Sequence, residues 1–178
     1  MKVIFTCGGT AGHVNPALAL AGLIRQRRPD SEILFVGARR GIEKRLIEEA
    51  GWPFKAVEIS SFHRSFKPKE IRHNLISLKN LITSPAQARA LLKEFPADLV
   101  VGTGGYASFP ALLAATMLKI PTCVHEANAV PGVTTKLAAN KADRVLVAFE
   151  ESRQYYKKPG EVRVVGMPIR KEFTETTR

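Results

Sequence analysis

The sequence has 178 residues, a length typical of one compact domain. Hydrophobic residues make up 45% of it and charged residues 24%, a globular balance that excludes disordered, collagen-like and disulfide-scaffold classes. Lysine and arginine outnumber aspartate and glutamate by 27 to 16, and the formal net charge of +11 predicts a polyanionic partner: nucleic acid, a phosphorylated ligand or an anionic membrane surface.

The sequence contains no membrane-spanning or secretory pattern. Apolar runs such as PALLAATML (110–118) fall short of the roughly 18 residues that a spanning helix needs, and MKVIFTCGG (1–9) is too short and glycine-broken for a signal peptide. We therefore expect a cytoplasmic chain. Cys7 and Cys123 are too few for a disulfide framework and lack a metal-site spacing, so we expect two buried thiols and no metal.

Short β-branched runs alternate along the chain with longer segments of helical pattern. The strand-like runs cover residues 2–7, 32–37, 54–59, 97–103, 121–126, 144–149 and 162–166, and the helical segments cover residues 16–28, 42–51, 110–119 and 134–142. This order and spacing predict βαβ units in a parallel sheet, and uniformly apolar strands are typical of a sheet covered on both faces. We predict a doubly wound, Rossmann-like α/β domain with helices on both faces of its parallel sheet.

Two of the predicted strand-to-helix turns resemble each other. TCGGTAGHVNPALALA (6–21) and GTGGYASFPALLAA (102–115) each end a strand, pass through glycines and enter a helix through Pro-Ala-Leu. Proline is tolerated in the first turn of a helix, so Pro16 and Pro110 are expected to mark helix starts. Because both turns would lie at the carboxyl edge of one parallel sheet, they predict a ligand-binding crevice there.

The first turn has the composition of an anion-binding loop. Gly8, Gly9 and Gly12 permit close approach of a ligand to the backbone, and the N–H groups of the following helix can face an anion. The turn lacks the Lys-Ser/Thr of a P-loop, and Cys7 stands where a G-x-G-x-x-G pattern begins, so a tight turn without a ligand is the alternative. His13 is either structural or a proton acceptor at the crevice.

The second turn supports an alternative function. Gly102, Gly104 and Ala107 satisfy G-x-G-x-x-A, and Glu126 ends the next strand where a ribose-binding acid would lie, which suggests a non-catalytic NAD(P)- or nucleotide-binding module. The pattern follows a late strand rather than the first, which weakens it. The net positive charge would also suit a nucleic-acid-binding protein. However, the basic residues are interleaved with aliphatic side chains and the aromatic content is only 7%, neither of which is typical of nucleic-acid binding.

A third polar motif, HEANAVPG (125–132), directly follows a predicted buried strand. His125, Glu126 and Asn128 lie within four residues of one another, and polar loop residues at such a place are candidates for binding. The alternative is that Glu126 and Asn128 cap a helix that begins near Pro131.

Residues 61–95 break the alternation with a segment longer than a normal crossover. Lysine and arginine far outnumber Glu70 and Glu94 in it and are interleaved with aliphatic side chains. Such a segment is typical either of a solvated helix with its apolar stripe on the core or of a helix on an anionic bilayer. The residues predicted to dock on the membrane are Phe62, Phe66, Lys69, Arg72, Leu75, Ile76, Lys79, Leu81 and Ile82.

The three motifs, in this order and spacing, resemble the amino-terminal half of the peptidoglycan N-acetylglucosaminyltransferases, and the resemblance extends to GMPIR (166–170). It implies half of a two-domain GT-B fold: residues 1–170 as the acceptor-binding domain, residues 171–178 as the start of an interdomain linker, and a donor domain outside this sequence. It also implies an inverting transfer, without metal or cofactor, of N-acetylglucosamine from UDP-N-acetylglucosamine to undecaprenyl-diphosphate-linked N-acetylmuramyl-pentapeptide. The implied location is peripheral, on the inner face of the cell membrane.

The resemblance further implies roles for individual residues. The acid–base or orienting groups would be His13 and Glu126. The donor would contact Thr10, Ala11, Gly12, Asn128 and Arg170, and the acceptor diphosphate would contact Gly104, Gly105, Tyr106 and Ser108. Two positions depart from the family pattern, since Ala11 replaces a glycine and Ala127 replaces a glutamine.

Overall fold

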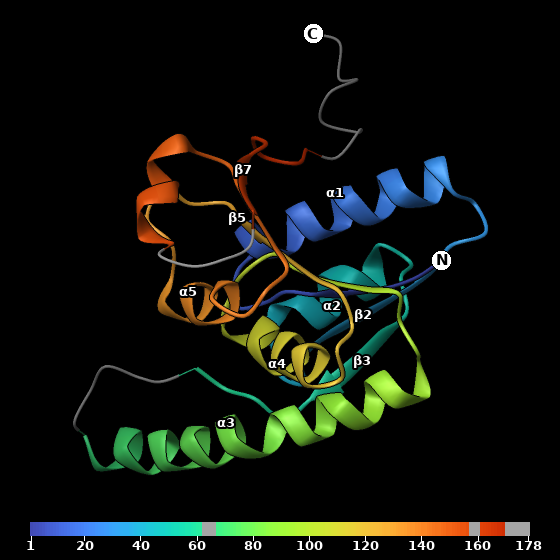
Figure 1. The fold of residues 1–178 in the computed structure, drawn as a ribbon. Helices are drawn as coiled ribbons and strands as arrows, with labels where there is room; N and C mark the ends of the chain where they lie inside the picture. Colours follow the sequence, from blue (N-terminus) through green and yellow to red (C-terminus); the bar gives the residue numbers. More distant parts are fainter. Residues whose placement is uncertain (62–66, 157–160, 170–178) are drawn as a thin grey trace, which may run out of the picture.

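The computed structural model of the chain describes residues 1–61, 67–156 and 161–169. Its strands form a 7-stranded parallel sheet in the order β3-β2-β1-β4-β5-β6-β7 (Figure 1). The strands are β1 (Lys2–Thr6), β2 (Glu32–Ala38), β3 (Phe54–Val57), β4 (Leu99–Gly102), β5 (Thr122–Glu126), β6 (Arg144–Val147) and β7 (Glu161–Val164). The predicted parallel α/β sheet is confirmed.

Helices cover both faces of the sheet, as predicted. They are α1 (Ala11–Arg27), α2 (Ile42–Glu49), α3 (Pro68–Glu94), α4 (Phe109–Met117) and α5 (Val133–Ala139), with 3-10 turns η1 (Tyr106–Ser108) and η2 (Glu150–Tyr155). Alternate side chains of β1 point to opposite faces. Val3 and Phe5 join one core cluster with residues of α1 and α2, whereas Ile4 joins a second with residues of α3, α4 and α5.

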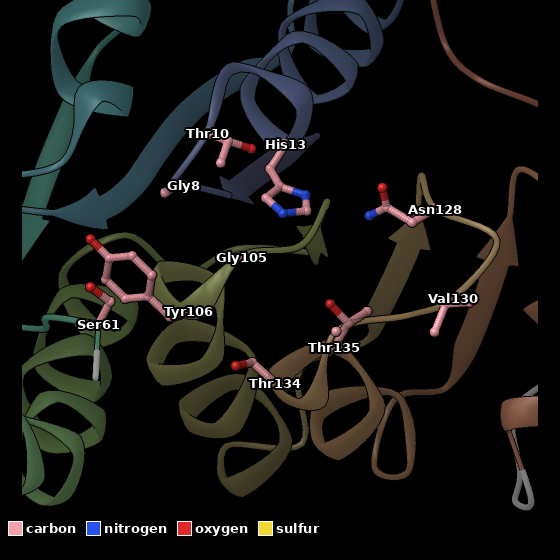
Figure 2. Close-up of a pocket in the computed structure, with 12 residues that line it drawn as sticks. Gly8, Thr10, His13, Ser61, Gly105, Tyr106, Asn128, Val130, Thr134 and Thr135 are labelled. Atoms are coloured by element: carbon pink, nitrogen blue, oxygen red, sulfur yellow. The ribbon is translucent and has the colours of Figure 1, made fainter. Parts of the chain in front are cut away.

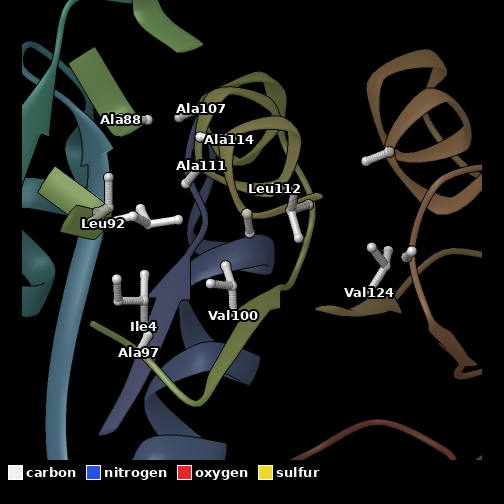
Figure 3. Close-up of a cluster of buried hydrophobic side chains, with 14 of the residues drawn as sticks. Ile4, Ala88, Leu92, Ala97, Val100, Ala107, Ala111, Leu112, Ala114 and Val124 are labelled. Carbon is white, nitrogen blue, oxygen red and sulfur yellow. The ribbon is translucent and has the colours of Figure 1, made fainter. Parts of the chain in front are cut away.

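The second cluster is the larger part of the core and lies between the sheet and α3 to α5 (Figure 3). Ile4, Val100 and Val124 from three neighbouring strands meet Leu92 of α3 and Leu112 of α4 there. Each of these side chains is at most 3% exposed. Burial of one such side chain stabilises a fold by about 1.5–3 kcal/mol. The position of α4, which follows the second glycine turn, is therefore set by the core.

Helix α1 begins about one turn before Pro16, the residue predicted from the sequence as its start. Pro16 lies inside α1, so its prediction as a helix start is wrong, whereas Pro110 does lie in the first turn of α4. The backbone carbonyl of Thr10 accepts the N–H groups of His13 (3.1 Å) and Val14 (3.3 Å), which adds a turn ahead of the proline. This added turn brings His13 into the helix.

The two cysteines differ in their burial. Cys7 is buried, as predicted, and burial together with the negative charge of Glu43 raises the pKa of its thiol. Cys123 is only partly buried, which corrects its prediction, and partial burial raises its pKa to about 11. Both thiols are therefore protonated at neutral pH and are poor nucleophiles.

The long segment between β3 and β4 forms α3. Its Ser77, Ser84, Ala88 and Leu92 are buried against the core. Leu75, Ile76 and Ile82 are exposed, whereas Leu81 is partly buried and packs against the core cluster, which does not favour it as a docking residue. Phe62 and Phe66 lie outside the described residues. No helix in the described ranges is both long and apolar enough to span a bilayer.

The topology places the two glycine turns beside each other. β1 pairs with β2 on one side and with β4 on the other, so successive connections leave the sheet in opposite directions from this point. Open parallel sheets bind ligands at such a switch point, outside the carboxyl ends of the strands. The turn after β1 and the turn after β4 therefore flank the predicted crevice.

Candidate functional site

A pocket of about 500 Å³ lies at the carboxyl edge of the sheet (Figure 2). It is lined by residues that follow β1, β3, β4 and β5 and by the first turn of α5. The lining residues are Gly8, Gly9, Thr10, His13, Ser61, Gly105, Tyr106, Asn128, Val130, Gly132, Thr134 and Thr135. The predicted crevice thus exists, and most of the polar groups around it come from separate loops.

The imidazole of His13 reaches into this pocket (Figure 2). The side-chain hydroxyl of Thr103 donates a hydrogen bond to its backbone carbonyl at 2.6 Å, which ties the start of α1 to the end of β4. The ring nitrogen Nδ1 is buried and has no hydrogen-bond partner among the described residues. Nδ1 packs against Gly104, so a proton from a ligand hydroxyl would have to be accepted by the other ring nitrogen.

The second glycine turn, after β4, packs against the first glycine turn, after β1. Gly104 and Gly105 have φ of 101° and 81°, a backbone conformation that L side chains rarely adopt. A Cβ atom at Gly104 would lie 2.6 Å from Nδ1 of His13, and one at Gly105 would overlap the carbonyl oxygen of Gly8. Glycine is therefore needed at both positions for the second turn to pack against the first and against His13.

Tyr106 and Ser61 form the side of the pocket that faces α3. The ring of Tyr106 lies beside Gly9, and partial burial and the charge of Glu43 raise the pKa of its hydroxyl, which therefore stays protonated at neutral pH. The carbonyl of Ser61 accepts a hydrogen bond from the Ser77 hydroxyl at 3.1 Å and lies 3.0 Å from Nε2 of His73. Both partners belong to α3, so this helix holds the wall of the pocket.

Asn128 lines the pocket and Glu126 holds it in place. Oε1 of Glu126 accepts the backbone N–H of Asn128 at 2.8 Å and its side-chain amide at 2.7 Å. Glu126 is 1% exposed and does not line the pocket, so of the two roles expected for it, acid–base or orienting, its contacts favour the orienting one. Its carboxylate orients the amide of Asn128 at the pocket.

The neighbouring residues of this motif have structural roles. The hydroxyl of Ser152 donates to the carbonyl of Asn128 at 2.7 Å, which ties the loop to η2. His125 is buried, and burial lowers the pKa of its imidazole; its Nε2 lies 3.0 Å from the carbonyl of Gly166. The alternative that Glu126 and Asn128 cap a helix is wrong, because α5 begins at Val133 and Gly132 precedes it as the N-cap.

Several of the predicted site residues lie beside the pocket without lining it. Ala11 and Gly12 are exposed at the start of α1. Gly104 contacts His13, and the buried Ser108 donates its hydroxyl to the carbonyl of Gly105 at 2.8 Å. Arg170 and the predicted linker 171–178 lie outside the described residues. Of the predicted contacts, Thr10, His13, Gly105, Tyr106 and Asn128 line the pocket.

The geometry does not favour the dinucleotide alternative. Ala107 is fully buried in the core, and a Cβ at Gly102 would collide with the side chain of Leu112. Gly104 is occupied by its contact with His13, and Glu126 by its bonds to Asn128. The pattern G-x-G-x-x-A is thus explained by packing inside the domain.

Sequence reasoning missed one wall of the pocket and one buried acid. Ser61 follows a strand at the same sheet edge, and Thr134 and Thr135 begin a helix there, so the rule that identified the other loops applies to them as well. Glu43 is fully buried below the first glycine turn. Its sequence context, IEKRLIEE, is that of an ordinary amphipathic helix and gives no signal of this.

Comparison with known proteins places the chain in a family. Residues 3–147 match the family described as the glycosyltransferase family 28 N-terminal domain. A curated relative from Acetivibrio thermocellus, named UDP-N-acetylglucosamine–N-acetylmuramyl-(pentapeptide) pyrophosphoryl-undecaprenol N-acetylglucosamine transferase, is 46% identical over 178 residues, which are 100% of this chain and 47% of the relative. A relative of the same name from Clostridioides difficile is 41% identical over 175 residues, 97% of this chain and 42% of the relative.

Solved structures give the same assignment of the fold. The crystal structure of MurG from Acinetobacter baumannii is 28% identical and superposes with a TM-score of 0.73 over 98% of this chain and 47% of that one. A UDP-GlcNAc 2-epimerase from Neisseria meningitidis, 17% identical with a TM-score of 0.62 over 94% of this chain and 46% of that one, shares the fold. The chain spans about half the length of the curated relatives it matches.

Proposed function

This chain belongs to glycosyltransferase family 28 as its amino-terminal domain, and we propose that it is the acceptor-binding half of an inverting, metal-independent N-acetylglucosaminyltransferase. The donor is UDP-N-acetylglucosamine and the acceptor is undecaprenyl-diphosphate-linked N-acetylmuramyl-pentapeptide. The names of the relatives at 46% and 41% identity support this choice of substrates. The carboxyl-terminal half of such an enzyme would complete the donor site.

The observation that carries the proposal is the pocket between the two glycine turns. It brings an imidazole, an oriented asparagine and the N-terminal end of α1 to one place. A helix N-terminus and fixed N–H groups favour a departing diphosphate, and an imidazole can take up a proton at neutral pH. Sugar transfer from a nucleotide diphosphate needs both.

The proposed reaction assigns the proton to His13. The 4-hydroxyl oxygen of the acceptor attacks the anomeric carbon of N-acetylglucosamine from the face opposite UDP. A new C–O bond forms as the bond between that carbon and the diphosphate oxygen breaks, with inversion at the anomeric carbon. The hydroxyl proton passes to His13, and UDP leaves with the bonding electron pair.

The remaining lining residues then divide between the two substrates. Thr10 and Asn128 would contact the donor, with Ala11, Gly12 and Arg170 as further donor contacts beside the pocket. Gly105 and Tyr106 would face the acceptor diphosphate, supported by Gly104 and Ser108. Tyr106 keeps its proton, so it can donate a hydrogen bond to a phosphate oxygen.

The direct test is transfer of labelled N-acetylglucosamine to a lipid-linked acceptor by the protein extended to the full length of its relatives. We expect label in the lipid product and release of UDP in equal amounts. NAD(P) serves as the comparison ligand: stabilisation of the protein by NAD(P), without transfer from UDP-N-acetylglucosamine, would favour the dinucleotide-binding alternative.

We further propose that α3 attaches the protein to the inner face of the cytoplasmic membrane, where the lipid-linked acceptor lies. Leu75 is 64% and Ile82 71% exposed, and Ile76 is exposed beside them. Lys69, Arg72 and Lys79 are exposed on the same helix. Apolar side chains that insert shallowly, next to cations that meet anionic headgroups, are typical of a helix lying on a bilayer.

This attachment predicts a salt-sensitive preference for anionic vesicles. Each basic residue near such a surface contributes about 1 kcal/mol, which corresponds to about fivefold in partitioning, and salt weakens the attraction. We expect the combined change of Leu75, Ile76 and Ile82 to serine to abolish most co-sedimentation with anionic vesicles at low salt. Neutral vesicles should bind little of the wild-type protein.

A matched control lies on the other face of the sheet. Leu23 of α1 and Ile42 of α2 are also exposed aliphatic residues, at 41% and 44%. Their double change to serine should leave co-sedimentation unchanged. Equal pelleting on neutral and anionic vesicles, or undiminished binding by a folded α3 triple variant, would refute membrane attachment through α3.

A further inference from the structure

A buried carboxylate lies beneath the first glycine turn. Glu43, in the first turn of α2, is 0% exposed, although its neighbours Lys44 and Arg45 are exposed. Within the described residues, no lysine or arginine forms an ion pair with it. A buried carboxylate without a cation does not stabilise a fold as a well-packed aliphatic side chain would. Its contribution therefore lies in the backbone groups that it bonds.

The carboxylate joins two strand ends through backbone hydrogen bonds. Oε2 accepts the N–H of Gly9 at 3.2 Å, and Oε1 accepts the N–H of Ala38 at 2.9 Å. Gly9 belongs to the turn after β1 and lines the pocket, whereas Ala38 ends β2. The N–H of Gly9 is thus directed inward to Glu43 instead of outward to a ligand. The glycine turn is fixed from below by this bond.

Three glycines leave the space that the Glu43 side chain fills. A Cβ atom at Gly8 or Gly41 would overlap the carboxylate, and a Cβ at Gly37 would lie 2.9 Å from Cγ of Glu43. These glycines come from the turn after β1, from β2 and from the turn before α2. Gly8, which the sequence suggested as part of an anion cradle, is required here by the side chain of Glu43.

The Glu43 carboxylate also affects the pocket, which lies on the other side of the first glycine turn. The ring of Tyr106 lies against the other side of the loop, since a Cβ at Gly9 would lie 3.2 Å from its Cε1. Thr10 follows directly, and its carbonyl accepts the N–H of His13 at 3.1 Å. A shift of Gly9 would therefore move Thr10, His13 and the surface that Tyr106 contacts. The pocket depends on one inward bond.

We propose that Glu43 is the positioning residue of this site: its carboxylate, bonded to the N–H groups of Gly9 and Ala38, holds the first glycine turn so that Thr10 and His13 face the substrates. This inference rests on the proposed transferase function. Glu43 does not touch a substrate. It acts through the backbone of the turn.

The test compares Glu43→Gln with wild type in the full-length protein. Glutamine has nearly the same volume but can accept only one of the two N–H groups with its oxygen, and its amide would face the other. We expect the variant to fold, with kcat/KM per folded molecule reduced at least tenfold and faster hydrogen exchange in a peptide covering residues 6–12. The control is Glu48→Gln, which changes an exposed carboxylate on the same helix that pairs with Lys44. It should change neither kcat/KM nor the rate of hydrogen exchange.

A second comparison tests the packing of the glycines. Gly41→Ala should reduce activity in the wild-type background, because its Cβ displaces the carboxylate, but should cause no further loss in a Glu43→Ala background. Additive losses, unchanged kcat/KM with unchanged exchange in Glu43→Gln, or failure of that variant to fold would each overturn the proposal. If the wild-type protein transfers no sugar, the proposed function fails, and the hydrogen-exchange comparison still decides whether Glu43 holds the turn.

Discussion

Replacement of His13 by alanine in the full-length protein should lower kcat by about 10²–10⁴-fold, the range expected for loss of a general base. The physical reason is that the imidazole lines the pocket between the two glycine turns, where an imidazole can take up a proton from a substrate hydroxyl. The side chain is partly buried at the start of α1 and contributes little to the core. We therefore expect the variant to keep its melting temperature within a few degrees.

Two further variants separate a base from a structural histidine. His13→Gln keeps hydrogen-bonding groups but cannot take up a proton at neutral pH, so it should lose as much kcat as alanine does. Asn15→Ala, two residues further along α1, is the control and should retain activity. An unchanged kcat in His13→Ala, with normal melting, would assign His13 to structure and leave the proton acceptor to another group.

The sheet and its ligand edge were predictable because each depends on a local pattern. Apolar strands alternating with helices specify a parallel sheet, and the carboxyl ends of its strands gather the loops that follow them. This rule indicated Asn128, whereas Thr10 and Tyr106 came from the family resemblance. The rule locates loops, but it does not decide which side chain in a loop faces the ligand.

The misplaced residues depend on contacts between distant segments. Glu126 was expected at the crevice because it ends a strand, but its carboxylate is bonded to Asn128 two residues later and lies behind it. The glycines of both turns read as a cradle for phosphate, whereas Gly105 packs on Gly8 and Gly8 makes room for Glu43. Leu81 is an aliphatic residue like its exposed neighbours, and only the course of α3 over the core packs it partly against the core cluster.

The 178-residue chain on its own should show no detectable transferase activity. Ligand sites typically bury 70–90% of a small ligand's surface, and the described pocket would contact a ligand from the edge of one sheet only. The curated relatives are about twice as long as this chain. A donor held from one side would be bound weakly and would keep its anomeric carbon open to water.

Mixing this chain with a separate carboxyl-terminal half tests the same prediction. Supplying the carboxyl-terminal half as a separate chain should restore only a trace of activity, because a linker gives the two halves an effective concentration in the millimolar range that mixing does not reach. The restored activity should rise with the concentration of the added half and disappear when this chain carries His13→Ala. Turnover of UDP-N-acetylglucosamine by the 178-residue chain alone at a rate close to that of the full-length protein would contradict a site divided between two domains.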